Sequence, residues 1–173
     1  DIKNFTPVKD LSQNGSSITK LITDNKTSAK YVSKTINESE EENYSTELFQ
    51  LSNINHPTIV KFIGYSKEDF DEKPNFTLIQ EYAQNGSLYD FILKNQENPN
   101  SINSKQKLII LLGIARGMML LHKCHIVHGN LKPQNILLNE QLYPLIDDFV
   151  FSNNDKLNSL EYLSPEALNF GND

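Results

Sequence analysis

Cysteine is almost absent from this chain of 173 residues, which contains Cys124 alone. One thiol cannot close an internal disulfide or form the thiol pair of a metal site, so we expect Cys124 to be a small core residue. This cysteine usage fits a reducing, intracellular and cytoplasmic setting. Long apolar runs are absent too: the longest, residues 108–115, is far short of the ~20 residues that cross a bilayer. The N-terminus shows no signal-peptide core, so we predict no membrane insertion.

Basic residues are outnumbered, with 16 Lys and Arg against 22 Asp and Glu and a formal net charge of −6. They form no stripe, whereas nucleic-acid binding needs cations clustered against phosphates, so we exclude DNA and RNA as partners. Hydrophobic residues make up 38% and charged residues 22%, close to the averages of globular proteins. The length and composition therefore predict one folded domain or part of one.

The first half of the chain has the pattern of a β-meander followed by a helix and a hairpin. Residues 18–22 and 30–36 are rich in strand-forming side chains and are flanked by turn-forming segments. Residues 44–54 carry apolar side chains at helical spacing, which predicts a helix. Residues 58–65 and 76–82 are apolar runs of strand length, which predict two further strands joined by a polar loop.

The second half is predicted to be helical. Ser87 suits the N-cap of a helix over residues 88–93, and Asn103 or Ser104 marks the start of a longer helix. The longer helix has a stripe of i, i+3, i+4, i+7 type, which we expect to be largely buried; it consists of Leu108, Leu111, Leu112, Ala115, Met119 and His122. The fold class is therefore α+β, with a β-rich part with one helix over residues 1–82 and a helical part over residues 83–173.

Five motifs then follow one another in a familiar order. The stretch 126–138 contains His128-Gly129-Asn130-Leu131-Lys132 and Asn135, and Asp148-Phe149-Val150 follows it. Ser164-Pro165-Glu166 comes later, and Lys34 and Glu47 lie upstream. This series resembles the catalytic loop, the metal-binding segment, the A-P-E motif, the strand lysine and the helix glutamate of the protein kinase family. The resemblance covers almost the whole chain and is of the serine/threonine or tyrosine-kinase-like type.

The resemblance implies a bilobal protein-kinase-like fold, a β-rich N-lobe with one helix plus the first part of a helical C-lobe, that binds ATP and Mg²⁺. Lys34, oriented by Glu47, would contact the phosphates, Asn135 and Asp148 would hold Mg²⁺, and Lys132 would stabilise the transferred phosphoryl group. The position of the catalytic base is taken by Asn130. The resemblance assigns adenine contacts to Gln80, Glu81, Ala83 and Leu137, and a phosphate loop to Ser12, Asn14, Gly15 and Ser17.

Several positions depart from the family pattern. Asn130 replaces the Asp that accepts the substrate proton, and because general-base help is worth ~10²- to 10⁴-fold, we expect slow phosphate transfer. Gly129 replaces an Arg, and Val150 replaces the Gly of D-F-G, which exchanges a residue free to take positive φ for a β-branched one. The phosphate loop keeps one glycine, Gly15. Because asparagine is abundant, Asn14 and Asn130 are also open to an explanation by compositional drift rather than selection.

Three functions stay open at this point. The first is a pseudokinase-like signalling module that keeps parts of the ATP and Mg²⁺ site and acts on a protein substrate or signalling partner. The second is a weakly active serine/threonine-type kinase, and the third is a scaffold that binds no nucleotide. The chain ends at Asp173, so we expect a C-lobe truncated after the activation segment. Sequence alone does not predict the oligomeric state.

Overall fold

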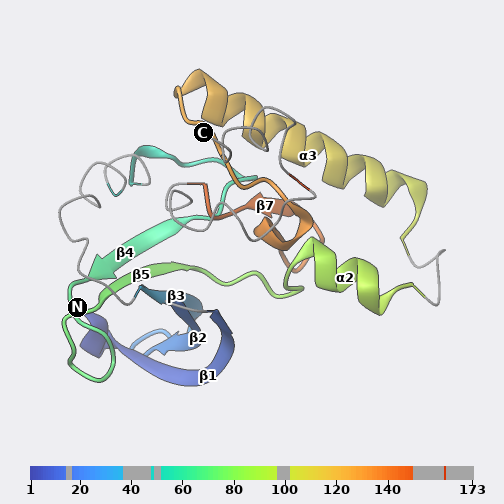
Figure 1. The fold of residues 1–173 in the computed structure, drawn as a ribbon. Coiled ribbons are helices and arrows are strands. Elements are labelled where there is room, and N and C mark those ends of the chain that lie inside the picture. Colours follow the sequence, from blue (N-terminus) through green and yellow to red (C-terminus); the bar gives the residue numbers. More distant parts are fainter. Residues whose placement is uncertain (15–16, 37–47, 49–51, 97–101, 150–161, 163–173) are drawn as a thin grey trace, which may run out of the picture. The chain divides into compact units, whose positions relative to one another are not determined.

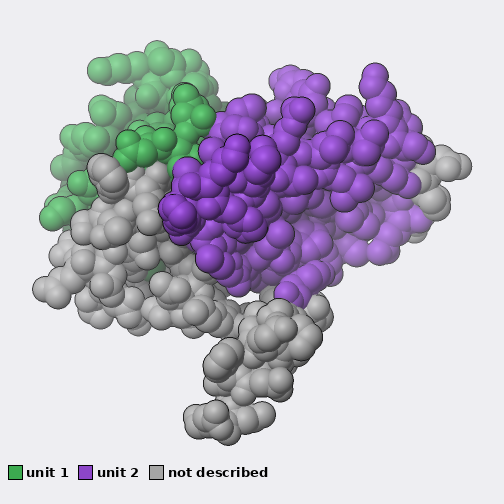
Figure 2. Space-filling view, turned by 90° about the horizontal axis from the view of Figure 1, so that it is seen from above, with its two compact units in different colours: residues 1–55, 60–82 green, residues 56–59, 83–173 purple. Residues whose placement is uncertain are grey.

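The computed structural model describes residues 1–14, 17–36, 48, 52–96, 102–149 and 162. The chain forms two compact units, which Figure 2 shows in different colours. The first unit comprises Asp1–Asn55 and Val60–Tyr82, and the second comprises His56–Ile59 and Ala83–Asp173. Among the described residues, strands dominate the first unit, and the 20-residue helix of residues 104–123 lies in the second. The predicted α+β class is therefore confirmed.

The first unit is built on a five-stranded antiparallel sheet in the order β1-β2-β3-β5-β4 (Figure 1). A short 3₁₀ helix, η1 (Ile2–Asn4), precedes the sheet. The strands are β1 (Phe5–Asn14), β2 (Ser17–Asp24), β3 (Lys30–Ile36), β4 (Phe62–Ser66) and β5 (Phe76–Glu81). The predicted strands over 18–22, 30–36 and 76–82 are confirmed: β2 contains the first, β3 matches the second, and β5 ends one residue before the end of the third.

The strand β5 is the most continuously buried of the strands β2 to β5. Its residues from Phe76 to Gln80 are all buried, with β3 on one side and β4 on the other. Burial of successive residues means that both faces of the strand are covered, because successive side chains point to opposite faces. β5 supplies Leu78 and Ile79 to the core of this unit.

The strand predicted over residues 58–65 begins later than expected, at Phe62. Thr58 and Ile59 belong instead to the second unit. There, Ile59 forms a parallel bridge to Ile146, and the backbone N–H of Ile146 donates to the Thr58 carbonyl at 2.9 Å. The run of residues 58–65 thus contributes to both units, and its composition did not predict this division.

The helix predicted over residues 44–54 falls mainly outside the described residues. Within it, Leu48, Ser52 and Asn53 have helical backbone.

The described residues of the second unit form two α-helices and a small two-stranded sheet. The elements are α2 (Leu88–Lys94), α3 (Ser104–Lys123), the 3₁₀ helix η2 (Pro133–Asn135), β6 (Ile136–Leu138) and β7 (Pro144–Ile146). Both predicted helix starts are confirmed. The Ser87 hydroxyl accepts from the Asp90 N–H at 3.1 Å, and the Asn103 side chain accepts from the Gln106 N–H at 2.8 Å, so each cap satisfies a backbone donor of its first turn.

The face of α3 that packs into the unit is not the predicted one. The stripe expected to be buried is exposed, with Leu108, Leu111, Leu112 and Met119 each more than half accessible to solvent. Ala115 and His122 are exposed as well. The buried residues are Ile110, Gly113, Gly117 and Leu121.

Two glycines explain why this face of α3 is the buried one. A Cβ at Gly113 would meet the Pro144 ring, and one at Gly117 would lie 2.6 Å from Ile146 Cδ1. The helix backbone therefore lies directly on β7 (Figure 1) at a distance that larger side chains would prevent. Within the described residues no helix, α3 included, combines the length and apolar character that a membrane span requires.

The prediction that Cys124 is a core residue was also wrong. It is exposed and forms the C-cap of α3 rather than a core position. The chain leaves the helix through His125, whose positive φ of 58° lets Ile126 N–H donate to the Leu121 carbonyl at 2.9 Å. Cys124 sits at this turn, where its side chain has little to pack against.

Candidate functional site

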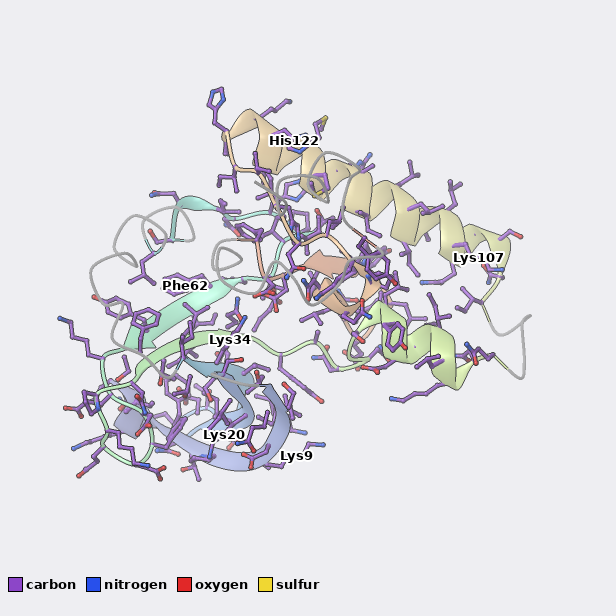
Figure 3. The ribbon with its side chains drawn as sticks, viewed as in Figure 1. Lys9, Lys20, Lys34, Phe62, Lys107 and His122 are labelled. Atoms are coloured by element: carbon purple, nitrogen blue, oxygen red, sulfur yellow. The ribbon has the colours of Figure 1, made fainter. Side chains whose placement is uncertain are left out.

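Lys34 lies in the middle of the sheet of the first unit. It is on β3, opposite Thr19 of β2 and Leu78 of β5, and Figure 3 labels its side chain. Its neighbours Ser33 and Thr35 are buried, whereas Lys34 itself is half-buried. Alternation along a strand thus turns the Lys34 side chain to the face opposite its neighbours. The sheet fixes the backbone of this lysine on both sides.

The predicted phosphate loop is the hairpin between β1 and β2. Ser12 pairs with Thr19, and Asn14 pairs with Ser17, so the two strands stay in register up to the turn. Gly15 lies outside the described residues, as do Glu47, Val150 and the segment 164–166. Ser12 is exposed and Ser17 half-buried. The structure therefore places the flanks of this loop and leaves its tip a prediction.

The end of β5 is held by two hydrogen bonds between Glu81 and Lys61. Gln80 is buried, and the next residue, Glu81, accepts a hydrogen bond from the Lys61 N–H through Oε1 at 2.6 Å. The Glu81 N–H donates in turn to the Lys61 carbonyl at 3.0 Å. Glu81 is thus fixed by both its side chain and its backbone.

The second unit begins with a segment that pairs with β6. Ala83 is buried, and the Asn85 N–H donates to the Leu138 carbonyl at 3.0 Å. The Leu138 N–H donates back to the Gly86 carbonyl at 2.8 Å, and Ser87 bridges Leu137. Leu137 is therefore held beside the segment that starts at Ala83.

Three site residues come together where η2 meets the segment after β7. The Asn130 amide Nδ2 lies 3.1 Å from Asp148 Oδ2, and the Asn135 amide Nδ2 lies 3.4 Å from the same oxygen. Asn135 Nδ2 also donates to the Asn130 carbonyl at 2.8 Å. We name these three residues the amide–carboxylate cluster. Lys132 lies between the two asparagines and caps η2, and its carbonyl accepts from the Asn135 N–H at 2.9 Å.

The backbone brings the cluster together through two left-handed residues. Asp148 has φ of 62° and Gly129 has φ of 71°. Gly129 takes this conformation without the Cβ clash that other residues meet, which is a local reason for a glycine here. Asp is one of the side chains that tolerate it. The Asp147 N–H donates to the Asn135 carbonyl at 2.9 Å, which ties the two segments together.

His128 supports the cluster from the core. It is 2% exposed, its Nδ1 lies 3.3 Å from the Asn130 backbone N–H, and its ring meets the buried Phe149 edge to face at 6.2 Å. Burial lowers the pKa of His128, partly opposed by hydrogen bonding and by the negative charge of Asp148. Sequence reasoning gave His128 no role, although its place two residues before Asn130 in the motif was a usable signal.

The chemistry of the cluster follows from its groups. Asn130 stands at the position of the proton acceptor, and a neutral amide that directs its N–H at a carboxylate has no basic atom to offer there. The Asp148 carboxylate fits a hard divalent cation. The two amides do not fit one as they are arranged, because both turn nitrogen toward Asp148. Within the described residues no three or more His, Cys, Asp and Glu side chains gather into a metal-binding group.

Comparison with known proteins identifies the family to which the chain is similar. The sequence model of the protein kinase domain matches residues 7–172. Interleukin-1 receptor-associated kinase 1 of Mus musculus is 36% identical over 110 residues, which are 62% of this chain and 15% of that protein. Serine/threonine/tyrosine-protein kinase HT1 of Arabidopsis thaliana is 34% identical over 109 residues, which are 63% of this chain and 26% of that protein.

A solved structure supports the same fold. The crystal structure of Rad53 1-466 in complex with AMP-PNP superposes with a TM-score of 0.81 and 24% sequence identity, over 97% of this chain and 43% of that one. The chain thus spans less than half the length of each of these proteins. The family model nevertheless covers nearly all of its residues. The chain therefore belongs to the protein kinase family, as the motif series predicted.

Proposed function

We propose that this chain is a pseudokinase-like signalling domain that binds ATP and transfers phosphate slowly or not at all. The observation that carries the proposal is the hydrogen bond from Asn130 Nδ2 to Asp148 Oδ2 at 3.1 Å. The group at the base position is neutral and is already donating a hydrogen bond. It cannot draw a proton from a substrate hydroxyl, and proton acceptance is what that position supplies in active kinases.

Nucleotide binding is supported by residues in each unit. In the first unit, Lys34 is held centrally in the sheet, and Gln80 and Glu81 end the strand beside it. In the second, Leu137 is fixed beside the segment from Ala83, and Asp148 is fixed by hydrogen bonds. We propose that these residues contact adenine and phosphates as the family resemblance assigns them. The Rad53 structure, with its AMP-PNP, is a relative of this fold that holds an ATP analogue.

A second function, a weakly active serine/threonine-type kinase, has its own support. Lys132 is present two residues after Asn130, and the Arabidopsis relative is called a serine/threonine/tyrosine-protein kinase. Positioning and charge stabilisation contribute most of phosphoryl transfer, so loss of the base slows the reaction without abolishing it. The substrate in this case is a protein hydroxyl.

Nucleotide binding is tested by thermal unfolding with and without ATP in magnesium buffer. At 100 times the dissociation constant, ATP should stabilise the chain by about 2.7 kcal/mol. Lys34→Met should remove most of this shift. The matched control is Lys30→Met on the same strand, where the exposed side chain starts β3; it should keep the shift. Absence of any shift at millimolar ATP would leave the nucleotide-free scaffold as the better account.

Impaired transfer is tested by a phosphotransfer assay on a generic protein substrate. Asn130→Asp restores a carboxylate at the base position and should raise the rate ~10²- to 10⁴-fold if the rest of the site is competent. Equal rates for both forms, well above background, would show that the chain is an active kinase and overturn the pseudokinase proposal.

A further inference from the structure

One of the two Asn-Gly pairs of the chain, Asn85-Gly86, lies near the start of the second unit. The Gly86 N–H donates to the Ala83 carbonyl at 3.2 Å and closes a turn, in which Gly86 has a φ of 68°. Gly86 is exposed, so water reaches the turn. Asparagine followed by glycine is prone to deamidation, because glycine has no Cβ that would hinder attack by its own nitrogen. The contacts of Asn85 therefore decide whether this reaction starts and what it changes.

The side chain of Asn85 faces hydrogen-bond acceptors. Its Nδ2 lies 2.6 Å from the carbonyl oxygen of Asn139 and 3.4 Å from that of Glu140. A carbonyl oxygen only accepts, so the nitrogen of the amide, and not its oxygen, must point there. A carboxylate has no hydrogen to donate and would place negative charge against two carbonyl oxygens. An aspartate at this position therefore cannot make the contact.

The backbone around Asn85 is bonded to β6, the strand that precedes Asn139. The Asn85 N–H donates to the Leu138 carbonyl at 3.0 Å, and the Leu138 N–H donates back to the Gly86 carbonyl at 2.8 Å. In the closed segment the two groups that would react, the Gly86 nitrogen and the Asn85 amide, are both engaged in hydrogen bonds. The reaction therefore requires that residues 83–87 first open from β6.

We propose that Asn85-Gly86 is a latent deamidation site, which turns a reversible opening of residues 83–87 into a permanent one. In the open segment the Gly86 nitrogen attacks Asn85 Cγ and closes a succinimide ring. The bond from Cγ to Nδ2 breaks, and Nδ2 leaves as ammonia with the proton from the Gly86 nitrogen. Water then opens the ring, either at Cγ to give aspartate or at the backbone carbonyl carbon of residue 85 to give isoaspartate.

Neither product restores the closed segment. Aspartate has lost the donor that faces the carbonyls of Asn139 and Glu140. Isoaspartate has lost it as well, and it also adds Cβ to the main chain, which shifts the backbone groups that bond to Leu138. The modified chain therefore keeps a weakened junction between residues 83–87 and β6.

The rate is measured by peptide mass spectrometry on the whole chain, incubated at neutral pH in native buffer and in urea. Three hydrogen bonds must break to free the reacting groups, those to the carbonyls of Ala83, Leu138 and Asn139. Each lowers the population of the open form roughly fivefold, so Asn85 should deamidate on the order of 10²-fold more slowly in native buffer than in urea. Equal rates in the two solutions would overturn the proposal.

The consequence is measured by thermal unfolding of three variants. Asn85→Ala removes the donor and should lower the Tm by about 2 to 4 °C. Asn85→Asp, which is one of the two products, should lower it further, because charge then faces the two carbonyl oxygens. The matched control is Gln84→Glu, the same change of amide to carboxylate at the exposed neighbouring position, which should stay within about 2 °C of the wild type. An Asn85→Asp chain no less stable than Asn85→Ala would contradict the proposal.

If Asn85→Asp fails to fold, chemically deamidated chain replaces it. The wild type is deamidated in urea, returned to native buffer, and the form modified at residue 85 is isolated by ion exchange. Hydrogen exchange of the Leu138 amide, which donates to the Gly86 carbonyl, is then compared with that of unmodified chain. Faster exchange at Leu138 supports the proposal, and equal exchange overturns it. None of these measurements uses nucleotide, so their outcome does not depend on the proposed function.

Discussion

Replacing Gly117 with alanine tests whether α3 lies as close to β7 as the structure describes. In isolation this change stabilises a helix, since alanine is favoured over glycine by about 1 kcal/mol in a helix interior. In this chain the added Cβ would lie 2.6 Å from Ile146 Cδ1, 2.8 Å from Thr58 Oγ1 and 3.2 Å from the Thr58 carbonyl oxygen. The two effects oppose each other, and packing determines which is larger.

The neighbours of Gly117 have little freedom to move. Ile146 is fully buried, and its backbone N–H is bonded to the Thr58 carbonyl. Thr58 Oγ1 lies 2.9 Å from His56 Nδ1, so rotating it would break a hydrogen bond worth about 1 kcal/mol. Overpacking of a dense core costs about 1 to 3 kcal/mol. Together these costs exceed the helix gain, and we expect a net loss of roughly 1 to 3 kcal/mol.

The measurement is thermal unfolding followed by circular dichroism. A loss of that size should lower the Tm by about 2 to 12 °C for a chain of this length. The control is Gly64→Ala on β4, where an added Cβ meets nothing within 4 Å; it should stay within about 0.5 kcal/mol of the wild type. A Gly117→Ala chain as stable as the wild type, or more so, would refute the packing of α3 against Thr58 and Ile146.

Two further predictions concern pH. Burial lowers the pKa of His128, so the unfolded chain binds a proton more readily than the folded chain does. The free energy of unfolding should therefore fall as the pH drops below about 6.5. In an equilibrium unfolding series, His128→Gln should flatten this decline, whereas His122→Gln, at an exposed position, should not. Burial opposes ionisation of Asp69, but hydrogen bonds from Asn75, Lys73 and Asp71 outweigh it and lower the pKa of this carboxyl group. The ionised Asp69 therefore stabilises the fold fully above the unfolded pKa near 3.9, and this stabilisation is lost as the pH falls through the lower folded pKa. Asp69→Ala should therefore cost on the order of 1 kcal/mol at pH 7 and less below pH 3, by the same measurement; an equal loss at both values would contradict this role.

The strands were predictable because their signals are local. β2 and β3 combine β-branched side chains with flanking turns, and the structure returns residues 30–36 as a strand with the predicted bounds. The start of β4 was not predictable. Residues 58 and 59 are as apolar as those that follow, and only the bridge from Ile59 to Ile146, which joins distant parts of the chain, assigns them to the other unit.

The prediction of which face of α3 is buried was wrong for a related reason. Apolar periodicity identifies the helix, but it favours whichever face carries large side chains. The face that packs here is marked by Gly113 and Gly117, which carry almost no hydrophobic signal and act by letting the backbone approach β7. A sequence in which two glycines recur four residues apart in a helix is therefore open to a second interpretation, close packing, that hydropathy does not provide.

The candidate site was predictable in membership and only partly in geometry. The motif series named Asn130, Asn135 and Asp148, and the structure brings these three within hydrogen-bond distance of one another. Their polarity was not predictable, because it depends on which carbonyl faces which amide. Ligand assignments such as Asn135 for Mg²⁺ stay predictions, since the motif fixes a residue type and the surrounding backbone fixes its orientation.

Compositional drift stays an open explanation for Asn130, and several other asparagines of this chain hold structural positions. Asn103 caps α3, and the Asn139 side chain accepts from two backbone N–H groups in the turn before β7. Asn85 reaches the Asn139 carbonyl at 2.6 Å across 54 residues of sequence. Asparagine can both donate and accept, which suits it to such junctions. Asn130 uses the same property at the base position: its side-chain amide donates to Asp148 Oδ2 at 3.1 Å, and its backbone carbonyl accepts from the Asn135 amide at 2.8 Å.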